Sequence, residues 1–347
     1  MLGIDWYINQ LRYKVNQSDS IDVIYNSDQI EGRKRDYIPF QANSSYPDTR
    51  YYDLDSIMRY YVGSDDADKV QNRGEGEFIN TFPVHKLTVP VDKSVVLANG
   101  TVTVKDNVVN AMQFDIPKNS IFKNDVAVLT IIAANHWKRP IYFTSSFGEL
   151  GFGKYLRKDG LSYRLVPVEG DEWNADWAMD KMMNKFGFGN ADLPGVYYDE
   201  ENRRHLLTIR SAYAELAGYL VSKNRKEDAR KLLEKADKGM LQENFAYGMV
   251  SRGNMHNRTS LLFLEACYRA EDKDLAAKVY ASVKKDLEQQ IKYYNTLDGW
   301  RADNLGEERR MAESYLKGLE DMQKNFNAPK VASPEAGKVI DSNAARK

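Results

Sequence analysis

Residues 126–144 read VAVLTIIAANHWKRPIYFT, and no other stretch bears as directly on the fold. The apolar run Val126–Ala134 predicts a buried strand, and Pro140–Thr144, rich in β-branched and aromatic residues, predicts another. The sequence NHWKR at residues 135–139 separates the two. We therefore expect a sheet that brings polar groups to one edge, where they form either a binding site or a structural corner.

The residues at this edge have side chains that suit ligand binding. The guanidinium of Arg139 can pair with a carboxylate or a phosphate through two hydrogen bonds, and the ring of Trp137 can stack on a sugar. The structural alternative is that Trp137 packs in the core while Arg139 bridges to a carboxylate such as Asp5 or Asp36. The pattern names no catalytic residue. The candidate ligand-binding residues are Asp5, Asp36, Asn135, His136, Trp137 and Arg139.

The composition is typical of a soluble globular protein with more than one domain. The chain has 347 residues, of which 29% are charged and 42% hydrophobic, and its formal net charge is -1. This charge, with no basic stripe, argues against nucleic acid as a partner. The run Val126–Ala134 is about half as long as a membrane span, so we expect the chain by itself to be soluble. The single cysteine, Cys267, lies in a helical pattern and is expected to be buried.

Residues 1–165 alternate between helical and strand-like patterns and predict a mixed α/β domain. Asp53 or Asp55 is placed to cap one of the helices. The helices predicted from residue spacing are Trp6–Val15 and Leu54–Tyr61. The strands predicted from a two-residue period are His85–Val96 and Thr101–Val109, with a hairpin at Asn99-Gly100 between them. Met112–Ile116 is a further predicted strand.

The rest of the chain predicts an all-helical domain. Residues 166–198, with several glycines among acidic and aromatic residues, predict an irregular connection. Residues 199–326 carry apolar residues at spacings of three and four and predict helical hairpins. Within them, Arg210–Glu243 fits a tetratricopeptide-type repeat, although an ordinary helical bundle is an equally open interpretation. The repeat places Tyr213, Leu216, Ala217, Leu220, Ala229, Leu233 and Ala236 at its large and small packing sites.

Two further helical segments and a tail complete this domain. Thr259–Tyr294 has the period of a second hairpin but matches the small-residue positions poorly. Leu305–Phe326 predicts a closing helix. Residues 327–347 are rich in Ala, Pro, Ser and Lys and lack the apolar residues that would offset ordering, so we expect a mobile tail.

Three other motifs are weaker signals of chemistry. Gly148–Lys154 satisfies the GxxxxGK part of a phosphate-binding loop, but position 155 is Tyr and no helical pattern follows. The DxD motif of Asp53 and Asp55 is explained more simply by helix capping, and residues 65–68 by a solvated acidic turn. The histidines form no metal-binding or catalytic spacing. We therefore predict no cofactor and no metal site.

Four motifs together resemble a known family. They are LGIDWYINQLRYK at 2–14, GRKRDYIPF at 32–40, NHWKRPIYFT at 135–144 and LGFGKYLRKDGLSYRLVPV at 150–168. This combination is similar to the C-terminal soluble region of Bacteroidetes membrane proteins of the domain of unknown function 2723 type. That family is also classed as glycosyltransferase family 117 and is similar to protein O-mannosyltransferases. The resemblance covers residues 1–168 most closely and the helical region more loosely.

The resemblance implies a place in the cell and a set of partners. The transmembrane part of such proteins lies N-terminal, so we expect this chain to be a fragment that begins inside a domain. It implies a module at the periplasmic face of the inner membrane, in contact with the membrane-embedded part of the same protein. An acceptor polypeptide or glycan is the other implied partner. The resemblance transfers no catalytic residues.

Three functional hypotheses follow. The first is recognition of an acceptor or a partner, without catalysis by this chain alone. The second is a carbohydrate-active enzyme that uses carboxylates near Asn135–Arg139. The third is a protein-interaction scaffold built from the helical repeats.

Overall fold

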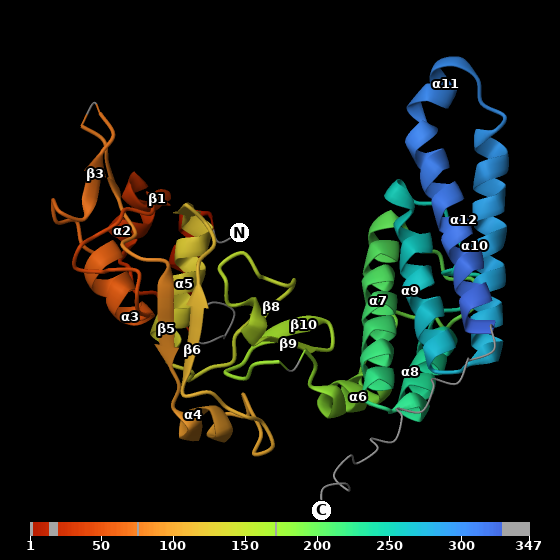
Figure 1. Cartoon of the computed structure of the whole chain (residues 1–347), viewed down its shortest axis with the longest axis horizontal. Helices are drawn as coiled ribbons and strands as arrows, with labels where there is room; N and C mark the ends of the chain where they lie inside the picture. Colours follow the sequence, from red (N-terminus) through yellow and green to blue (C-terminus); the bar gives the residue numbers. More distant parts are fainter. Residues whose placement is uncertain (1–2, 14–19, 75, 171, 328–347) are drawn as a thin grey trace, which may run out of the picture. The chain divides into compact units, whose positions relative to one another are not determined.

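The computed structural model describes residues 3–13, 20–74, 76–170 and 172–327. The chain divides into two compact units, Met1–Lys181 and Met182–Lys347. The first combines helices with small sheets and the second is helical (Figure 1), which confirms the predicted order of a mixed α/β region and a helical region. Among the described residues, none of the helices combines the length and the apolar character that crossing a bilayer requires. The tail expected to be mobile lies, after Asn327, outside the described residues, as does Val15.

The predicted strand Val126–Ala134 is wrong, because these residues belong to helix α5 (Lys123–Asn135). Nearly all of the helix is buried, so its apolar residues face every direction and leave no amphipathic period. An apolar run without a period does not distinguish a buried strand from a buried helix. The helix begins where the Asp125 carboxylate accepts a hydrogen bond from the Phe122 amide, at 3.1 Å.

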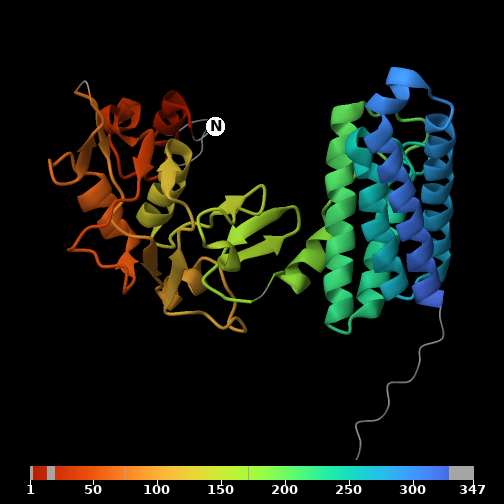
Figure 2. The same cartoon turned by 45° about the horizontal axis from the view of Figure 1, so that its top comes forward.

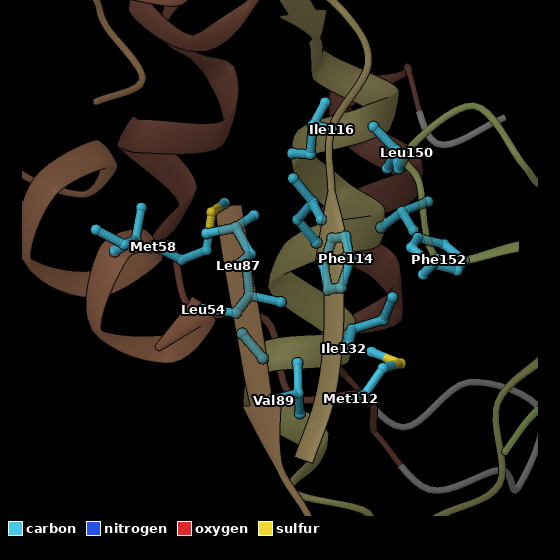
Figure 3. Packing of buried hydrophobic residues seen from close by; sticks show 14 of the residues in the cluster. Leu54, Met58, Leu87, Val89, Met112, Phe114, Ile116, Ile132, Leu150 and Phe152 are labelled. Atoms are coloured by element: carbon cyan, nitrogen blue, oxygen red, sulfur yellow. The ribbon is translucent and has the colours of Figure 1, made fainter. Parts of the chain in front are cut away.

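The central sheet of the first unit has the strand order β2-β5-β6. Its strands are β2 (Tyr52–Asp53), β5 (Lys86–Pro90) and β6 (Ala111–Asp115). β5 pairs parallel with β2 and antiparallel with β6, which places Leu87 opposite Phe114 and Val89 opposite Met112. Figure 3 shows these four side chains meeting Ile132 of α5 in one buried cluster. β6 confirms the predicted strand Met112–Ile116.

The hairpin predicted at Asn99-Gly100 and the strand predicted over Thr101–Val109 are wrong. The predicted strand His85–Val96 is correct only for β5, which ends at Pro90. Helix α4 (Lys93–Ala98) follows, because the Asp92 carboxylate accepts hydrogen bonds from the amide and hydroxyl of Ser94. Gly100 has a φ of +70° and lies directly after the helix, as expected for a helix end rather than a hairpin turn.

The remaining elements of the first unit surround this core. The predicted helix at Leu54–Tyr61 is confirmed as α3 (Leu54–Ser56) continued by the π-helix η2 (Ile57–Val62), and the Asp53 carboxylate caps α3 by accepting from the Ser56 amide at 2.8 Å. The other helical segments are α1 (Asp5–Leu11), α2 (Ser27–Glu31), η1 (Arg33–Arg35) and η3 (Gly153–Tyr155). The other strands are β1 (Tyr37–Pro39) with β7 (Ser120–Phe122), β3 (Val70–Asn72) with β4 (Phe78–Asn80), and β8 (Tyr142–Phe143), β10 (Ser162–Leu165) and β9 (Leu156–Asp159) in one sheet.

The second unit consists of packed helices. Residues 166–198, expected to be irregular, include α6 (Ala175–Asn184), which begins in the first unit and ends in the second. The helices that follow are α7 (Glu200–Ser222), α8 (Lys226–Gly239), η4 (Arg252–Asn254), α9 (Met255–Arg269), α10 (Lys273–Tyr294), α11 (Gly299–Asn304) and α12 (Gly306–Asn327). α7 packs on α8 and α9, and α10 packs on α9 and α12, so these helices lie side by side (Figure 2). All seven residues predicted at the repeat packing sites are buried, and so is Cys267.

Burial of His256 makes the stability of the helical unit depend on pH. His256 is 5% exposed, and burial, reinforced by the charges of Arg210 and Arg203, lowers its pKa to about 4 from an ordinary value of 6.5. Between these pH values the unfolded chain binds a proton that the folded chain does not bind, so the free energy of unfolding falls as the pH falls. Above pH 6.5 the His256 contribution is constant.

We expect the variant His256→Phe to lose this part of the pH dependence while keeping a ring beside Phe245, which lies 5.1 Å from the His256 ring. The measurement is the urea midpoint of both proteins at several pH values from 4 to 6.5. The difference between the two profiles excludes the contribution of the carboxylates, because these groups are present in both proteins. Parallel profiles would contradict the assignment to His256.

Candidate functional site

The carboxylates of Asp5 and Asp36 meet at a lysine that the sequence did not single out. Lys123 Nζ lies 2.6 Å from Asp5 Oδ1 and 2.5 Å from Asp36 Oδ1. Burial opposes the charge of Lys123, but hydrogen bonds to Asp36 and Asp5 hold its pKa above the ordinary value. Because both carboxylates are paired with one cation, they join α1 and the segment before β1 to the start of α5.

The predicted bridge from Arg139 to Asp5 or Asp36 is therefore wrong. Arg139 Nη1 donates instead to the backbone carbonyl of Ser20, at 2.7 Å. The pairing depends on the position of Lys123 in the first turn of α5. A strand at Val126–Ala134 did not predict this position.

Trp137 packs, as the structural alternative predicted. It is 7% exposed, its indole Nε1 donates to the carbonyl of Pro90 at 2.8 Å, and its own carbonyl accepts from the side chain of Asn99 at 2.5 Å. His136 and Trp137 have φ values of +45° and +60°, which are uncommon for residues with a large side chain. These two left-handed residues end α5, so the exposed His136 and buried Trp137 form a corner of the chain.

A cavity of about 610 Å³ nevertheless lies beside this corner. Its floor is the face of α5 that carries Val128, Ile131, Ile132 and Asn135. One wall is formed by Lys138–Ser145 together with Phe147, and the other by Tyr7 and Leu11 of α1 with Ile21 and Asp22. Pro140–Thr144, the second half of the segment NHWKRPIYFT, therefore borders a hollow, whereas His136 and Trp137 in its first half form a turn.

The cavity is apolar at its floor and charged at its rim. Lys138 and Arg139 form no ion pair with a carboxylate in the described part of the chain, and both are exposed. Asp22 is the carboxylate among the described lining residues, so the rim carries two positive charges and one negative charge. Asn135 is turned toward its own loop, where its Oδ1 accepts from the Arg139 amide at 3.3 Å.

A second hollow, of about 340 Å³, brings the DxD motif close to His136. Asp53 and Asp92 are helix caps, and Asp55 pairs with Arg59 at 2.8 Å. Each carboxylate therefore has a structural partner, as the capping interpretation predicted for Asp53. Within the described residues, no group of three or more His, Cys, Asp or Glu side chains is arranged to hold a metal ion.

The glycine-rich segment Gly148–Lys154 is a turn. It leads into η3 and strand β9 rather than into a helix, and Lys154 pairs with Glu169 at 2.9 Å. Gly151 has a φ of +84°, and a Cβ atom placed on it would lie 1.9 Å from the carbonyl oxygen of Asp115. The glycine is needed for close packing of the turn on β6.

We expect Gly151→Ala to lower the free energy of unfolding by at least about 2 kcal/mol, because the left-handed backbone and the clash with β6 both oppose a side chain. The matched control is Gly148→Ala in the same turn, where an added Cβ meets no atom within 4 Å. Thermal or urea unfolding of the two variants measures the difference. Equal stability of the two would mean that the contact of Gly151 with Asp115 does not constrain the turn.

Sequence reasoning missed most of the cavity. Tyr7, Ile131 and Phe147 come from three separated segments and belong to no motif that predicts a site. The one local signal was the aromatic pair Tyr142-Phe143 directly after a basic loop. Arg139 is the candidate residue that lines the cavity with a charged side chain, whereas Trp137 lies in the core.

Comparison with known proteins gives a family. No curated protein and no solved structure matches the sequence. The family model described as TMEM260-associated domain 2 matches residues 1–185, which include the whole first compact unit. Since the match covers 185 of 347 residues, the chain belongs to the TMEM260-associated domain 2 family, a family tied to a membrane protein.

Proposed function

We propose that this chain is the extramembrane module of a multi-spanning, glycosyltransferase-like membrane protein, and that it recognises an acceptor or a partner rather than carrying out catalysis. The module would lie at the periplasmic face of the inner membrane, beside the membrane-embedded part of the same protein. The family match supports the tie to a membrane protein. The resemblance to the domain of unknown function 2723 type, glycosyltransferase family 117, supports the finer assignment.

The cavity beside β8 is the observation that carries the recognition role. Its volume of about 610 Å³ falls in the range of ligand sites, and its lining is mainly apolar with a few polar groups at the rim. Aromatic side chains from two walls, Tyr7 and Phe143, provide flat apolar surfaces for a ligand. The cationic pair Lys138 and Arg139 favours an acceptor that carries a negative charge at one end.

The arrangement of carboxylates supports binding over hydrolysis or transfer of sugars. Glycoside chemistry ordinarily uses two carboxyl groups that flank the reacting bond. Asp5 and Asp36 are both paired with Lys123, and the described lining of the cavity contributes Asp22.

A carbohydrate-active enzyme is the second candidate, because Asp22 and Arg139 line the same cavity. Transfer or hydrolysis of sugar from a polyprenyl-phosphate donor by the purified chain would favour this candidate and contradict the non-catalytic role. Loss of that activity in Asp22→Asn would assign it to the cavity.

The binding role is tested by filling the cavity. Ile131 lies half-buried on the cavity floor, so Ile131→Trp places an indole in the hollow. The probe is the dye anilinonaphthalene sulfonate, which combines an aromatic body with one negative charge. We expect Ile131→Trp to weaken dye binding at least about tenfold, the loss that accompanies about 1.4 kcal/mol.

The matched control is Leu161→Trp, which adds the same side chain at an exposed position of the same unit, outside the cavity lining. Acceptor peptides and oligosaccharides are then tested for displacement of the dye. Equal dye binding by both variants would place the dye elsewhere and contradict the cavity as the recognition site. The upstream reading frame of the gene tests the membrane tether: transmembrane helices encoded in frame would support it.

A further inference from the structure

One edge of the sheet β8-β10-β9 is covered, whereas the other has no partner strand among the described residues. At the β9 edge, the Lys158 amide donates to the carbonyl of Glu172 at 2.8 Å, and Lys158 forms a parallel bridge with Trp173. At the β8 edge, no other described strand pairs with β8 apart from β10. Unpaired edges of this kind accept an added strand.

The register of β8 shows which backbone groups face this edge. Phe143 lies opposite Tyr163 and Tyr142 opposite Arg164, so Ile141 lies opposite Leu165. The Leu165 amide donates to the carbonyl of Ile141 at 2.9 Å, which makes this a hydrogen-bonded pair. In an antiparallel ladder such pairs alternate with non-bonded ones, so the N–H and C=O of Tyr142 point away from β10. Neither group has a backbone partner among the described residues.

The segment that contains β8 also borders the cavity. Lys138–Ser145 form one of its walls without interruption, and α1 forms the opposite wall. A strand added to β8 would lie about 4.8 Å from it, over the apolar floor of α5. Its side chains would alternate between the floor and the solvent, so apolar residues at every second position would fit the hollow.

Charge at the rim adds a preference at one end of the bound strand. Lys138 and Arg139 precede β8, and Arg139 is oriented by its bond to the carbonyl of Ser20. Asp22 on the facing wall offsets one of the two charges. An acidic residue near the start of β8 is therefore favoured over a basic one.

We infer that the β8 edge binds an extended polypeptide segment by strand addition, with apolar residues at alternate positions and acidic residues at one end. This inference rests on the proposed function and specifies the partner of the same cavity.

The test uses a fluorescein-labelled peptide with two aspartates followed by three Val-Thr repeats, and fluorescence anisotropy measures its binding to the full chain. Tyr142→Ala removes the ring and its contact with the Arg164 guanidinium, whereas Tyr142→Pro also removes the outward N–H. We expect Tyr142→Pro to bind the peptide about five to ten times more weakly than Tyr142→Ala, the effect of one lost hydrogen bond.

Two further arms make the result independent of variant folding. A peptide N-methylated at alternate amides cannot form the ladder, and we expect it to bind the unmodified protein at least about tenfold more weakly. Lys138→Glu should lower the affinity for the acidic peptide and raise the affinity for a peptide with two lysines in place of the aspartates. The control Lys93→Glu reverses a charge on an exposed residue outside the cavity and should change neither affinity.

Three outcomes would overturn strand addition: equal binding of the methylated peptide, equal binding by Tyr142→Pro and Tyr142→Ala, or dye displacement by dodecyl phosphate but not by the peptide. The last result would identify the occupant as an anionic amphiphile and leave the proposed recognition role intact. If Ile131→Trp changed the binding of no probe, the recognition role itself would fail.

Discussion

Replacing Trp137 by alanine is expected to lower the free energy of unfolding by about 3–5 kcal/mol, the usual effect of deleting a large buried aromatic side chain. Trp137 is 7% exposed and belongs to the core cluster of the first unit. The substitution also leaves the carbonyl of Pro90 without the indole donor that lies 2.8 Å away. The turn between α5 and β8 loses the side chain that holds it against the end of β5.

The measurement is urea unfolding of the full chain followed by far-ultraviolet circular dichroism, which does not depend on tryptophan emission. Trp6→Ala is the matched control, because Trp6 is 60% exposed and its removal should change stability by less than about 0.5 kcal/mol. A stable Trp137→Ala protein that had lost peptide or glycan binding would contradict the packing role and make Trp137 a binding residue.

Arg210→Ala is expected to destabilise the helical unit by about 3–5 kcal/mol. The side chain is fully buried, and its guanidinium lies 4.1 Å from the ring centre of Phe245 and 4.4 Å from that of Tyr247. It donates to the carbonyls of Phe245 at 2.7 Å and Ala246 at 2.9 Å. Alanine would leave both carbonyls without this donor, at about 1–3 kcal/mol each, and would open a void.

Burial of the Arg210 charge opposes folding, and this desolvation lowers the pKa of Arg210 to about 10. The two rings and the two carbonyls offset this desolvation, because a hydrogen bond to a charged group contributes about 1.5–3 kcal/mol. A cation–π contact from which water is excluded contributes about 2 kcal/mol. In Arg210→Ala, we therefore expect the loss of these hydrogen bonds and of packing to destabilise the protein more than the removal of a buried charge stabilises it.

Arg210→Met separates the two effects, because it restores side-chain volume without charge or donors. We expect the free energy of unfolding of Arg210→Met, measured in urea, to lie between those of the wild-type protein and Arg210→Ala. Arg204→Ala is the control on the same helix: its side chain is 67% exposed, paired with Glu201, and should contribute less than about 0.5 kcal/mol. Wild-type stability of Arg210→Met would show that the guanidinium does not hold the segment at Phe245.

The helical period predicted its elements correctly, whereas the two-residue period failed over Thr101–Val109 and held for His85–Val96 only over Lys86–Pro90. The spacing of three and four after residue 200 predicted α7 to α10, and the strand predicted at Met112–Ile116 is β6. In both cases one side of the element is buried and the other is not, so the sequence records the period directly. Capping of the helix after Asp53 was also predictable, because a cap depends on residues three positions apart.

The remaining errors fell where the period was missing or where two local preferences competed. Val126–Ala134 is buried on all sides of α5, and an apolar run of that length satisfies a strand as well as a helix. In Lys93–Gly100, the cap at Asp92 prevailed over the hairpin preference of the Asn-Gly pair.

The amino-acid sequence by itself determined the order of a mixed α/β region and a helical region, the buried faces of the helices and the family, because these depend on local periods and motifs. Only the tertiary structure decided that Lys123, rather than Arg139, pairs with Asp5 and Asp36, across 118 residues in the case of Asp5. It alone brought α1, α5 and β8 around one cavity and left one edge of β8 without a partner strand in the described part of the chain. Such contacts depend on how elements far apart in the sequence pack together, and the spacing of residues along the chain does not specify that packing.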